Sequence, residues 1–328
     1  MTKHPIKLAI ITVNYGTPEL TIRCIESVIQ DQDQLPAFRL YIVDNHSPDA
    51  SVEQIGDYLK THQLEDRVTL IAAPENGGYA YGNNQALRTA LAQDPLPEYF
   101  WLLNPDTQIR PGAARTLIEF LQSHPKAGLA GSRLEDEDGT PQTSAFRFHS
   151  PISEFIGTMQ LGVLDKLFGQ HLVPMALQDQ PFQAEWLAGA SVMMKKQVVK
   201  DVGLMDEVYF LYFEEVDYFV AARDKGWQAW YVPESRVHHM VGAATGISDH
   251  RKKAPRRPQY WFESRRRFFI KNFGKTTALF SDLALISGYG LWRIRRFLQR
   301  KPDIDPPHFL SDLIKNSVLR RGFSLDPE

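Results

Sequence analysis

The 328-residue sequence contains one cysteine, Cys24, which excludes an internal disulfide framework and is typical of a reducing compartment. It has no run of about 18 apolar residues, so we expect no transmembrane helix. The amino terminus enters a strand-like segment without an apolar core of signal-peptide length. No Rossmann dinucleotide fingerprint, Walker loop, internal repeat or low-complexity tract occurs. These absences predict a cytoplasmic globular protein.

The charge is distributed unevenly, although the net charge is only −2. Residues 251–301 carry fifteen Lys/Arg against Glu263 and Asp282, a net charge of +13, whereas residues 1–250 carry −13. The hydrophobic fraction of 43% is enough for a sizeable core. An acidic body with a strongly basic late segment indicates an anionic surface as a partner.

Strand-like and helix-like segments alternate along the first part of the chain. Short apolar, β-branched runs predict buried strands at 8–14, 38–43, 68–71, 99–103 and 127–131. Helical patterns between them predict helices at about 18–29, 51–61, 78–90 and 112–123. The alternation predicts an α/β fold with a doubly wound, mostly parallel sheet.

The chain divides into regions of different composition. We expect residues 1–250 to form one domain, with a first half at 1–132, an insertion without clean periodicity at 133–184, and a second half at 185–250. Residues 251–328 are predicted to form a basic, aromatic and partly amphipathic helical extension.

Asn104-Pro105-Asp106 directly follows the strand predicted at 99–103. Proline removes a donor from the strand ladder, so Asp106 lies just past the carboxyl end of that strand. Ligands bind at this edge in open α/β sheets, and a carboxylate there can hold a hard cation that in turn holds a diphosphate. The alternative is an ordinary strand-end turn, in which the same residue types are common.

Three further sets of polar residues could take part in catalysis or ligand binding. Glu214 and Glu215 follow an aromatic run, where partial desolvation would raise a carboxyl pKa and suit a general base; the alternative is a solvated helix start. His238 and His239 follow a strand ending and can ligate a metal, or they form a surface pair. Asp44 ends the second strand and could contact a nucleobase or ribose.

Taken in order, seven motifs resemble glycosyltransferase family 2, in its rhamnosyltransferase-like branch. They are Thr12-Val13-Asn14-Tyr15, Val43-Asp44-Asn45-His46-Ser47, the stretch from Glu75 to Asn84, Leu103-Asn104-Pro105-Asp106, Leu187-Ala188-Gly189-Ala190, the acidic segments Met205-Asp206-Glu207 and Phe213-Glu214-Glu215-Val216-Asp217, and His239. Seven motifs in order, over about residues 8–272, are specific in a way that a single motif is not.

The resemblance implies a GT-A fold and an inverting, metal-dependent transfer of the hexosyltransferase type, with rhamnosyl as one candidate sugar. It implies a nucleotide-diphosphate sugar as donor and a saccharide or lipid-linked acceptor, in polysaccharide assembly of the bacterial type. Glu215, beside Glu214, would be the catalytic base. Mg²⁺ or Mn²⁺ would be held by Asp106 and His239, with His238 as the alternative ligand.

The resemblance also implies the binding residues. The donor would be bound by Thr12, Asn14, Asp44, Asn76, Gly77, Asn83, Asn104 and Asp106, and the acceptor by Trp186, Gly189 and Ala190. One departure concerns Asn104, which stands where the Asp-X-Asp metal motif has its first acid. Two other functions remain open: a non-catalytic sugar-nucleotide-binding protein of the same fold, and a sugar-phosphate nucleotidyltransferase. The latter would need a glycine-rich basic loop where Tyr15-Gly16-Thr17-Pro18 stands.

The basic extension has two interpretations. Residues 279–298 predict a helix that could lie in the membrane plane, with Trp292, Phe297 and Leu298 in the bilayer and arginines at the headgroups. It could instead pack on the catalytic domain. We favour an anionic membrane surface bound through residues 251–301, and hence a peripheral location at the inner face of the cell membrane. Nucleic acid is not expected, since no known binding module is present.

Overall fold

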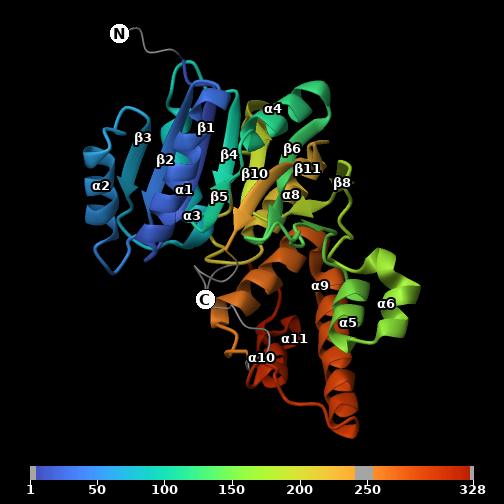
Figure 1. The fold of residues 1–328 in the computed structure, drawn as a ribbon. Helices are drawn as coiled ribbons and strands as arrows, with labels where there is room; N and C mark the ends of the chain where they lie inside the picture. Colours follow the sequence, from blue (N-terminus) through green and yellow to red (C-terminus); the bar gives the residue numbers. More distant parts are fainter. Residues whose placement is uncertain (1–4, 241–253, 326–328) are drawn as a thin grey trace. The chain divides into compact units, whose positions relative to one another are not determined.

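The computed structural model describes residues 5–240 and 254–325 (Figure 1). These divide into two compact units. The first comprises 5–146, 176–210 and 214–240, and the second 147–175, 211–213 and 254–325. The predicted insertion is therefore divided, because part of it joins the carboxyl-terminal extension. The boundary predicted between residues 250 and 251 lies outside the described residues.

The first unit is built on a nine-stranded sheet of order β3-β2-β1-β4-β10-β6-β11-β5, with β8 paired to β11. The strands are β1 (Leu8–Asn14), β2 (Phe38–Asp44), β3 (Val68–Ala72), β4 (Tyr99–Leu103), β5 (Thr107–Ile109), β6 (Ala127–Glu135), β8 (Phe182–Ala184), β10 (Ser191–Lys195) and β11 (Gln228–His239). Strands β7 (Ala145–Phe146) and β9 (Trp186–Leu187) pair separately. The run β3-β2-β1-β4 is parallel as predicted, whereas β10 is antiparallel to both of its neighbours. The α/β prediction is confirmed, with a sheet that is mixed in its second half.

The helices of this unit are α1 (Pro18–Gln30), α2 (Ser51–Thr61), α3 (Gly78–Leu91), α4 (Ala113–Ser123), α7 (Lys196–Val202) and α8 (Glu214–Asp224). The first four confirm the predicted helices to within a residue or two. Strand β11 runs to His239, because register shifts within it let it bend and continue beside β6 and β5. His238 and His239 are therefore the last two residues of this strand, and their predicted place after a strand ending is wrong.

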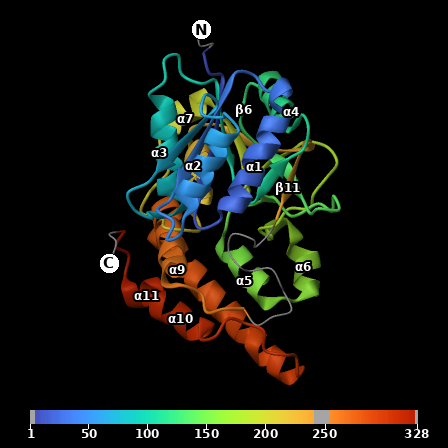
Figure 2. The same cartoon turned by 60° about the vertical axis from the view of Figure 1, so that its left-hand side comes forward.

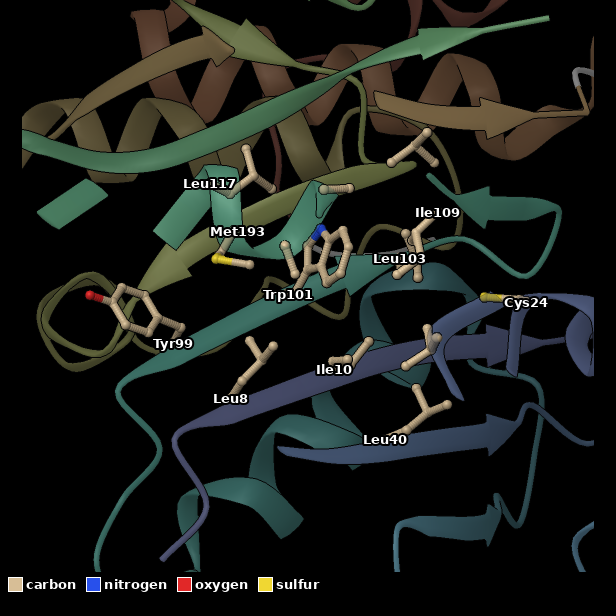
Figure 3. Packing of buried hydrophobic residues seen from close by; sticks show 14 of the residues in the cluster. Leu8, Ile10, Cys24, Leu40, Tyr99, Trp101, Leu103, Ile109, Leu117 and Met193 are labelled. Carbon is tan, nitrogen blue, oxygen red and sulfur yellow. The ribbon is translucent and has the colours of Figure 1, made fainter. Parts of the chain in front are cut away.

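The core on one face of the sheet joins β1, β4 and β10 to the helices α1, α2 and α4. Figure 3 shows Leu8, Ile10, Trp101 and Met193 facing one another in this core. Cys24 of α1 is fully buried here, and burial raises the pKa of its thiol to about 12. Cys24 is therefore a packing residue, as its helical position predicts.

The second unit is helical, with α5 (Pro151–Met159), α6 (Gly162–Phe168), α9 (Gln259–Leu298), α10 (Phe309–Asn316) and α11 (Val318–Arg321) (Figures 1 and 2). Helices α5 and α6 lie within the predicted insertion, whose sequence shows no clean periodicity. Helix α9 breaks at Gly274, which has φ 80°. The helix predicted at 279–298 is the second part of α9.

A buried ion cluster fixes α5 to α9. The Arg265 guanidinium donates to Glu154 Oε2 at 2.8 Å and to Asp282 Oδ1 at 2.5 Å. Trp292, on the second part of α9, packs in a small core with Tyr289 and is 7% exposed. The prediction that Trp292 enters a bilayer is therefore wrong. Within the described ranges, no helix combines the length and the apolar character needed to span a membrane.

Candidate active site

The predicted ligand residues of the first unit meet at one edge of its sheet. Strands β1, β2 and β4 run parallel and end there, while the antiparallel β10 begins there. Asn14 pairs with Asp44 in register, and the Asn104 amide N–H donates to Ala190 O at 3.0 Å. Segments far apart in the sequence are thus brought to the carboxyl edge, as the fold class predicts.

Hydrogen bonds hold Asp44 at the end of β2. Its carboxylate accepts from Asn14 Nδ2 at 2.7 Å, from the Ser47 amide at 2.9 Å and from Ser47 Oγ at 2.6 Å. Thr12 and Asn14 have no exposed surface, and Asp44 is 1% exposed. In this structure Asn14 therefore supports Asp44 and presents no surface of its own.

The start of α3 is anchored by an asparagine that the sequence reasoning did not assign. Asn45 Nδ2 donates to Asn76 Oδ1 at 2.9 Å and to Gly78 O at 3.0 Å. Gly78 has φ +87°, and a Cβ there would lie 1.8 Å from Phe210 O, so only glycine fits. Asn83 is buried and donates to Tyr79 O one turn earlier in α3.

Tyr79 links two parts of the site and was also missed. Its hydroxyl lies 3.2 Å from Asn104 Oδ1 and 3.1 Å from Gly189 O. A Cβ added to Gly189 would lie 2.6 Å from Glu215 Oε2 and 3.1 Å from the Tyr79 hydroxyl. Tyr79, Gly189 and Glu215 thus converge, and the glycine is required because a side chain has no room there. The only sequence signal for Tyr79 was its place beside Gly77-Gly78.

The acidic pair begins α8. The two residues before it, Tyr212 and Phe213, have φ of 70° and 69°, a left-handed conformation that side chains disfavour and that is enriched at functional sites. Burial raises the pKa of Glu215 to about 7, against the opposing effect of a hydrogen bond from the Gly189 backbone. Burial, and then the neighbouring Glu215 charge, raise the pKa of Glu214 well above its usual range. Glu214 is only 2% exposed, whereas Glu215 is half-buried, so Glu215 is the acid that can ionise near neutral pH within reach of a ligand.

Asp106 and His239 form the candidate metal pair. Asp106 Oδ1 lies 3.6 Å from His239 Nε2. Gln142 donates through Nε2 to His239 O and to Asp136 Oδ1, which turns its Oε1 toward His239 Nδ1 at 2.9 Å. Nδ1 therefore carries the proton and Nε2 faces Asp106 with its lone pair, the tautomer that ligates metals. Burial lowers the pKa of His239, against the effect of Asp106, and this favours the neutral ligand form.

Asp106 and His239 could hold a divalent cation whose remaining coordination positions are filled by a bound ligand and water. The described residues hold no group of three or more His, Cys, Asp or Glu able to bind a metal. Mg²⁺ sites often use one or two protein ligands, with substrate phosphates and water completing the shell. Of the two histidines, His239 faces Asp106, whereas His238 Nδ1 lies 3.4 Å from Gln108 Oε1.

The three predicted acceptor residues have different surroundings. Trp186 stacks on Phe146, with ring centroids 4.1 Å apart and planes at 16°, and it is 9% exposed. Ala190 is buried and its carbonyl accepts from Asn104. Gly189 is the member of the set that lies against Glu215.

The fold is that of the GT-A glycosyltransferases. A solved structure similar to this chain is the mannosyltransferase PcManGT from Pyrobaculum calidifontis in complex with GDP-Man and Mn²⁺. The similarity has a TM-score of 0.53 and 13% sequence identity, and covers 97% of this chain and 88% of that chain.

The sequence places the chain within this fold class. The model of the family described as Glycosyl transferase family 2 matches residues 9–175, and the chain belongs to this family. An N-acetylglucosaminyl-diphospho-decaprenol L-rhamnosyltransferase of Mycobacterium tuberculosis is 28% identical over 195 residues, which cover 56% of this chain and 62% of that protein. Rhamnosyltransferase WbbL of Escherichia coli K12 is 21% identical over 236 residues, covering 71% and 83%. The chain thus spans less than two thirds of the length of the mycobacterial relative.

Proposed function

We propose that this chain is an inverting glycosyltransferase of the hexosyltransferase type that uses a nucleotide-diphosphate sugar and a divalent cation. The acceptor is a saccharide or a lipid-linked saccharide in polysaccharide assembly, and the names of the relatives favour rhamnose as the sugar. The observation that carries the proposal is the position of Glu215. Its carboxyl, with a pKa of about 7, lies against Gly189 on the sheet edge that also holds Asp106 and His239.

Glu215 supplies the base that such a transfer needs. Its carboxylate removes the proton from the acceptor hydroxyl as that oxygen bonds to the anomeric carbon of the donor. The bond from that carbon to the diphosphate breaks on the opposite face, so the configuration inverts. A base with a pKa near the working pH combines a large ionised fraction with adequate basicity.

Asp106 and His239 would hold Mg²⁺ or Mn²⁺ through one carboxylate oxygen and one neutral imidazole nitrogen. When bound, such a cation supplies positive charge that stabilises the departing diphosphate. Asp44 would contact the nucleotide from the end of β2, and Asn76 and Gly77 would border it at the start of α3. Trp186, Gly189 and Ala190 remain the proposed acceptor side. We also propose that the enzyme works at the inner face of the cell membrane, which suits a lipid-linked acceptor.

The test is Glu215→Gln, an isosteric change that removes the base. Transfer and donor hydrolysis should fall by at least about 10²-fold, the range associated with positioned general bases, while donor affinity measured by calorimetry stays unchanged. Glu119→Gln is the matched control, because Glu119 is exposed on α4. Wild-type turnover by the Glu215 variant would refute the base assignment.

A screen of UDP-, dTDP- and GDP-sugars with Mn²⁺ identifies the donor. It also separates the alternatives, since a binding protein would retain a donor without hydrolysing it. A nucleotidyltransferase would release sugar phosphate when given pyrophosphate.

A further inference from the structure

Helices α5, α6 and α9 of the second unit enclose an apolar groove of about 880 Å³. Its walls include Ile152 and Phe155 of α5, Leu164 and Phe168 of α6, and Phe280 and Leu283 of α9. None of the residues that line it carries a charge. Ile152, Phe168, Phe280 and Leu283 are between 41% and 55% exposed, so the groove opens to its surroundings.

The groove continues into an apolar stripe on α9. Phe280, Leu283, Leu291, Ile294 and Leu298 are spaced so that they share one side of the helix, and they are between 42% and 73% exposed. From first to last they span about 27 Å at the rise of an α-helix. An exposed apolar surface of this length is unusual for a protein that works free in water and marks an interaction site.

The other sides of α9 are covered within the same unit. Leu285, Tyr289 and Trp292 pack in a core with Leu313 of α10. At Gly288 the helix approaches α5 closely, because a Cβ there would lie 2.4 Å from Thr158 Oγ1. Figures 1 and 2 show α10 and α11 on one side of α9 and α5 and α6 on the other. The stripe is thus the side that these neighbours leave open.

The exposed charges between residues 275 and 300 are positive. Lys275 and Arg293 are exposed on α9, and Arg300 is exposed two residues beyond its last residue, Leu298. The only carboxylate from residue 275 to residue 300 is Asp282, which is buried and paired with Arg265. A helix with an exposed apolar side, whose exposed charges are all cationic, suits the interface of an anionic bilayer, where the apolar side chains enter the acyl region and the cations meet phosphates.

We infer that the stripe and the groove form a membrane-docking surface for anionic bilayers. The inference rests on the proposed function only in that a lipid-linked acceptor would be met at such a surface. A second copy of the chain is a poorer occupant, because the exposed cations that accompany each stripe would repel one another. A single hydrocarbon chain would fill the groove and leave the rest of the stripe exposed.

The experiment is flotation of the full chain with vesicles of phosphatidylcholine containing about 30% phosphatidylglycerol. We expect the wild type to float with these vesicles, and to float less with pure phosphatidylcholine or in about 0.5 M NaCl, which screens the cations. Phe280→Glu and Ile294→Glu should each weaken partitioning about tenfold or more, since each places a charge among the apolar side chains. Leu319→Glu is the matched control, because Leu319 is 63% exposed on α11 and should tolerate the same change.

Three outcomes would overturn the inference of a membrane-docking surface. They are no flotation of the wild type, unchanged flotation of both stripe variants, or a dimer in solution that Phe280→Glu dissociates. Binding of a fluorescent fatty acid without vesicles, together with variants that float normally, would also overturn it. Thermal melts establish that the variants fold, and Phe280→Asn repeats the test without a new charge. Donor hydrolysis is measured on the same samples. A wild type that floats but hydrolyses no donor would support the surface and refute the proposed transferase.

Discussion

Replacing Gly189 by alanine tests the geometry of the candidate base directly. The added Cβ would lie 2.6 Å from Glu215 Oε2, whereas ordinary contacts of this kind begin at 3.4 Å, so the carboxylate must move by about 0.8 Å. A misplacement of about 1 Å at a reacting group can lower the rate about 10²-fold. We therefore expect kcat to fall about 10²-fold, equivalent to roughly 2.7 kcal/mol of activation free energy.

The same substitution should change the pH dependence. The Gly189 backbone hydrogen bond lowers the pKa of Glu215, so a displaced carboxylate that loses this bond titrates at a higher pH. The acid limb of kcat/KM should therefore move above pH 7, which a general loss of stability would not produce. Rates are measured from pH 5.5 to 9 with a saturating donor, and donor affinity is measured separately.

Gly157→Ala is the control for this experiment. Gly157 lies in α5, and a Cβ added there meets nothing within 4 Å, so the same chemical change should leave kcat and its pH dependence unaltered. A Gly189→Ala enzyme with the wild-type kcat and acid limb would show that Glu215 is not the base in this position.

Three further predictions follow from the charged groups. In the wild type, kcat/KM should rise about tenfold from pH 6 to pH 8, because Glu215 with a pKa of about 7 must lose its proton to act; a flat profile would contradict its role. Gln142→Leu removes the partner of His239 Nδ1 and should weaken Mn²⁺ binding about 10- to 100-fold by calorimetry, with donor-free protein as the sample; unchanged affinity would place the metal elsewhere. Burial raises the pKa of Glu154, but Arg265 and His149 outweigh this effect and lower the pKa to about 2. The contribution of Glu154 to stability is therefore present above about pH 4.5 and is lost as the pH falls toward 2. Glu154→Gln should lower the free energy of unfolding by about 3 kcal/mol at pH 7 in urea melts, with a smaller difference at pH 3, and equal stability at both pH values would refute the argument.

The amino-terminal half of the sheet could be predicted closely from the sequence. Each of its strands is a short apolar run that ends at a polar turn, and parallel strands bring those turns to one edge. The positions of Asn14, Asp44 and Asp106 at that edge follow from this pattern alone. The acidic pair could also be placed, since Glu214 and Glu215 directly follow an aromatic run.

The rest of the site depends on contacts between distant residues that periodicity does not encode. Strand β5 has three residues and pairs with β11 about 130 residues later, which is what brings His239 to Asp106. An apolar strand buried on both faces looks the same whether it runs parallel or antiparallel, so the direction of β10 could not be predicted. The role of Gln142 could not be predicted for the same reason, because its side chain contacts His239, which is distant in the sequence.

The missed helices have a different cause. In α5 and α6 several apolar side chains, among them Ile152, Val163 and Leu167, are exposed and do not face a core. Their exposure removes the regular alternation of buried and solvated positions on which helix prediction depends. The exposed apolar side chains that obscure the helical pattern of α5 and α6 are therefore also the ones that suit these helices to an apolar partner.

The neutral side chain of Asn104 affects both the candidate metal pair and the candidate base. The Tyr79 hydroxyl lies 3.2 Å from Asn104 Oδ1, and the same hydroxyl and Glu215 Oε2 both approach Gly189. A carboxylate at 104 would add a negative charge near the base, and like charge raises a carboxyl pKa, so Glu215 would titrate above about 7. The neutral asparagine leaves the metal pair with a single carboxylate, that of Asp106. In the proposed metal site, His239 would then supply the second donor from its neutral tautomer, without adding charge near Glu215.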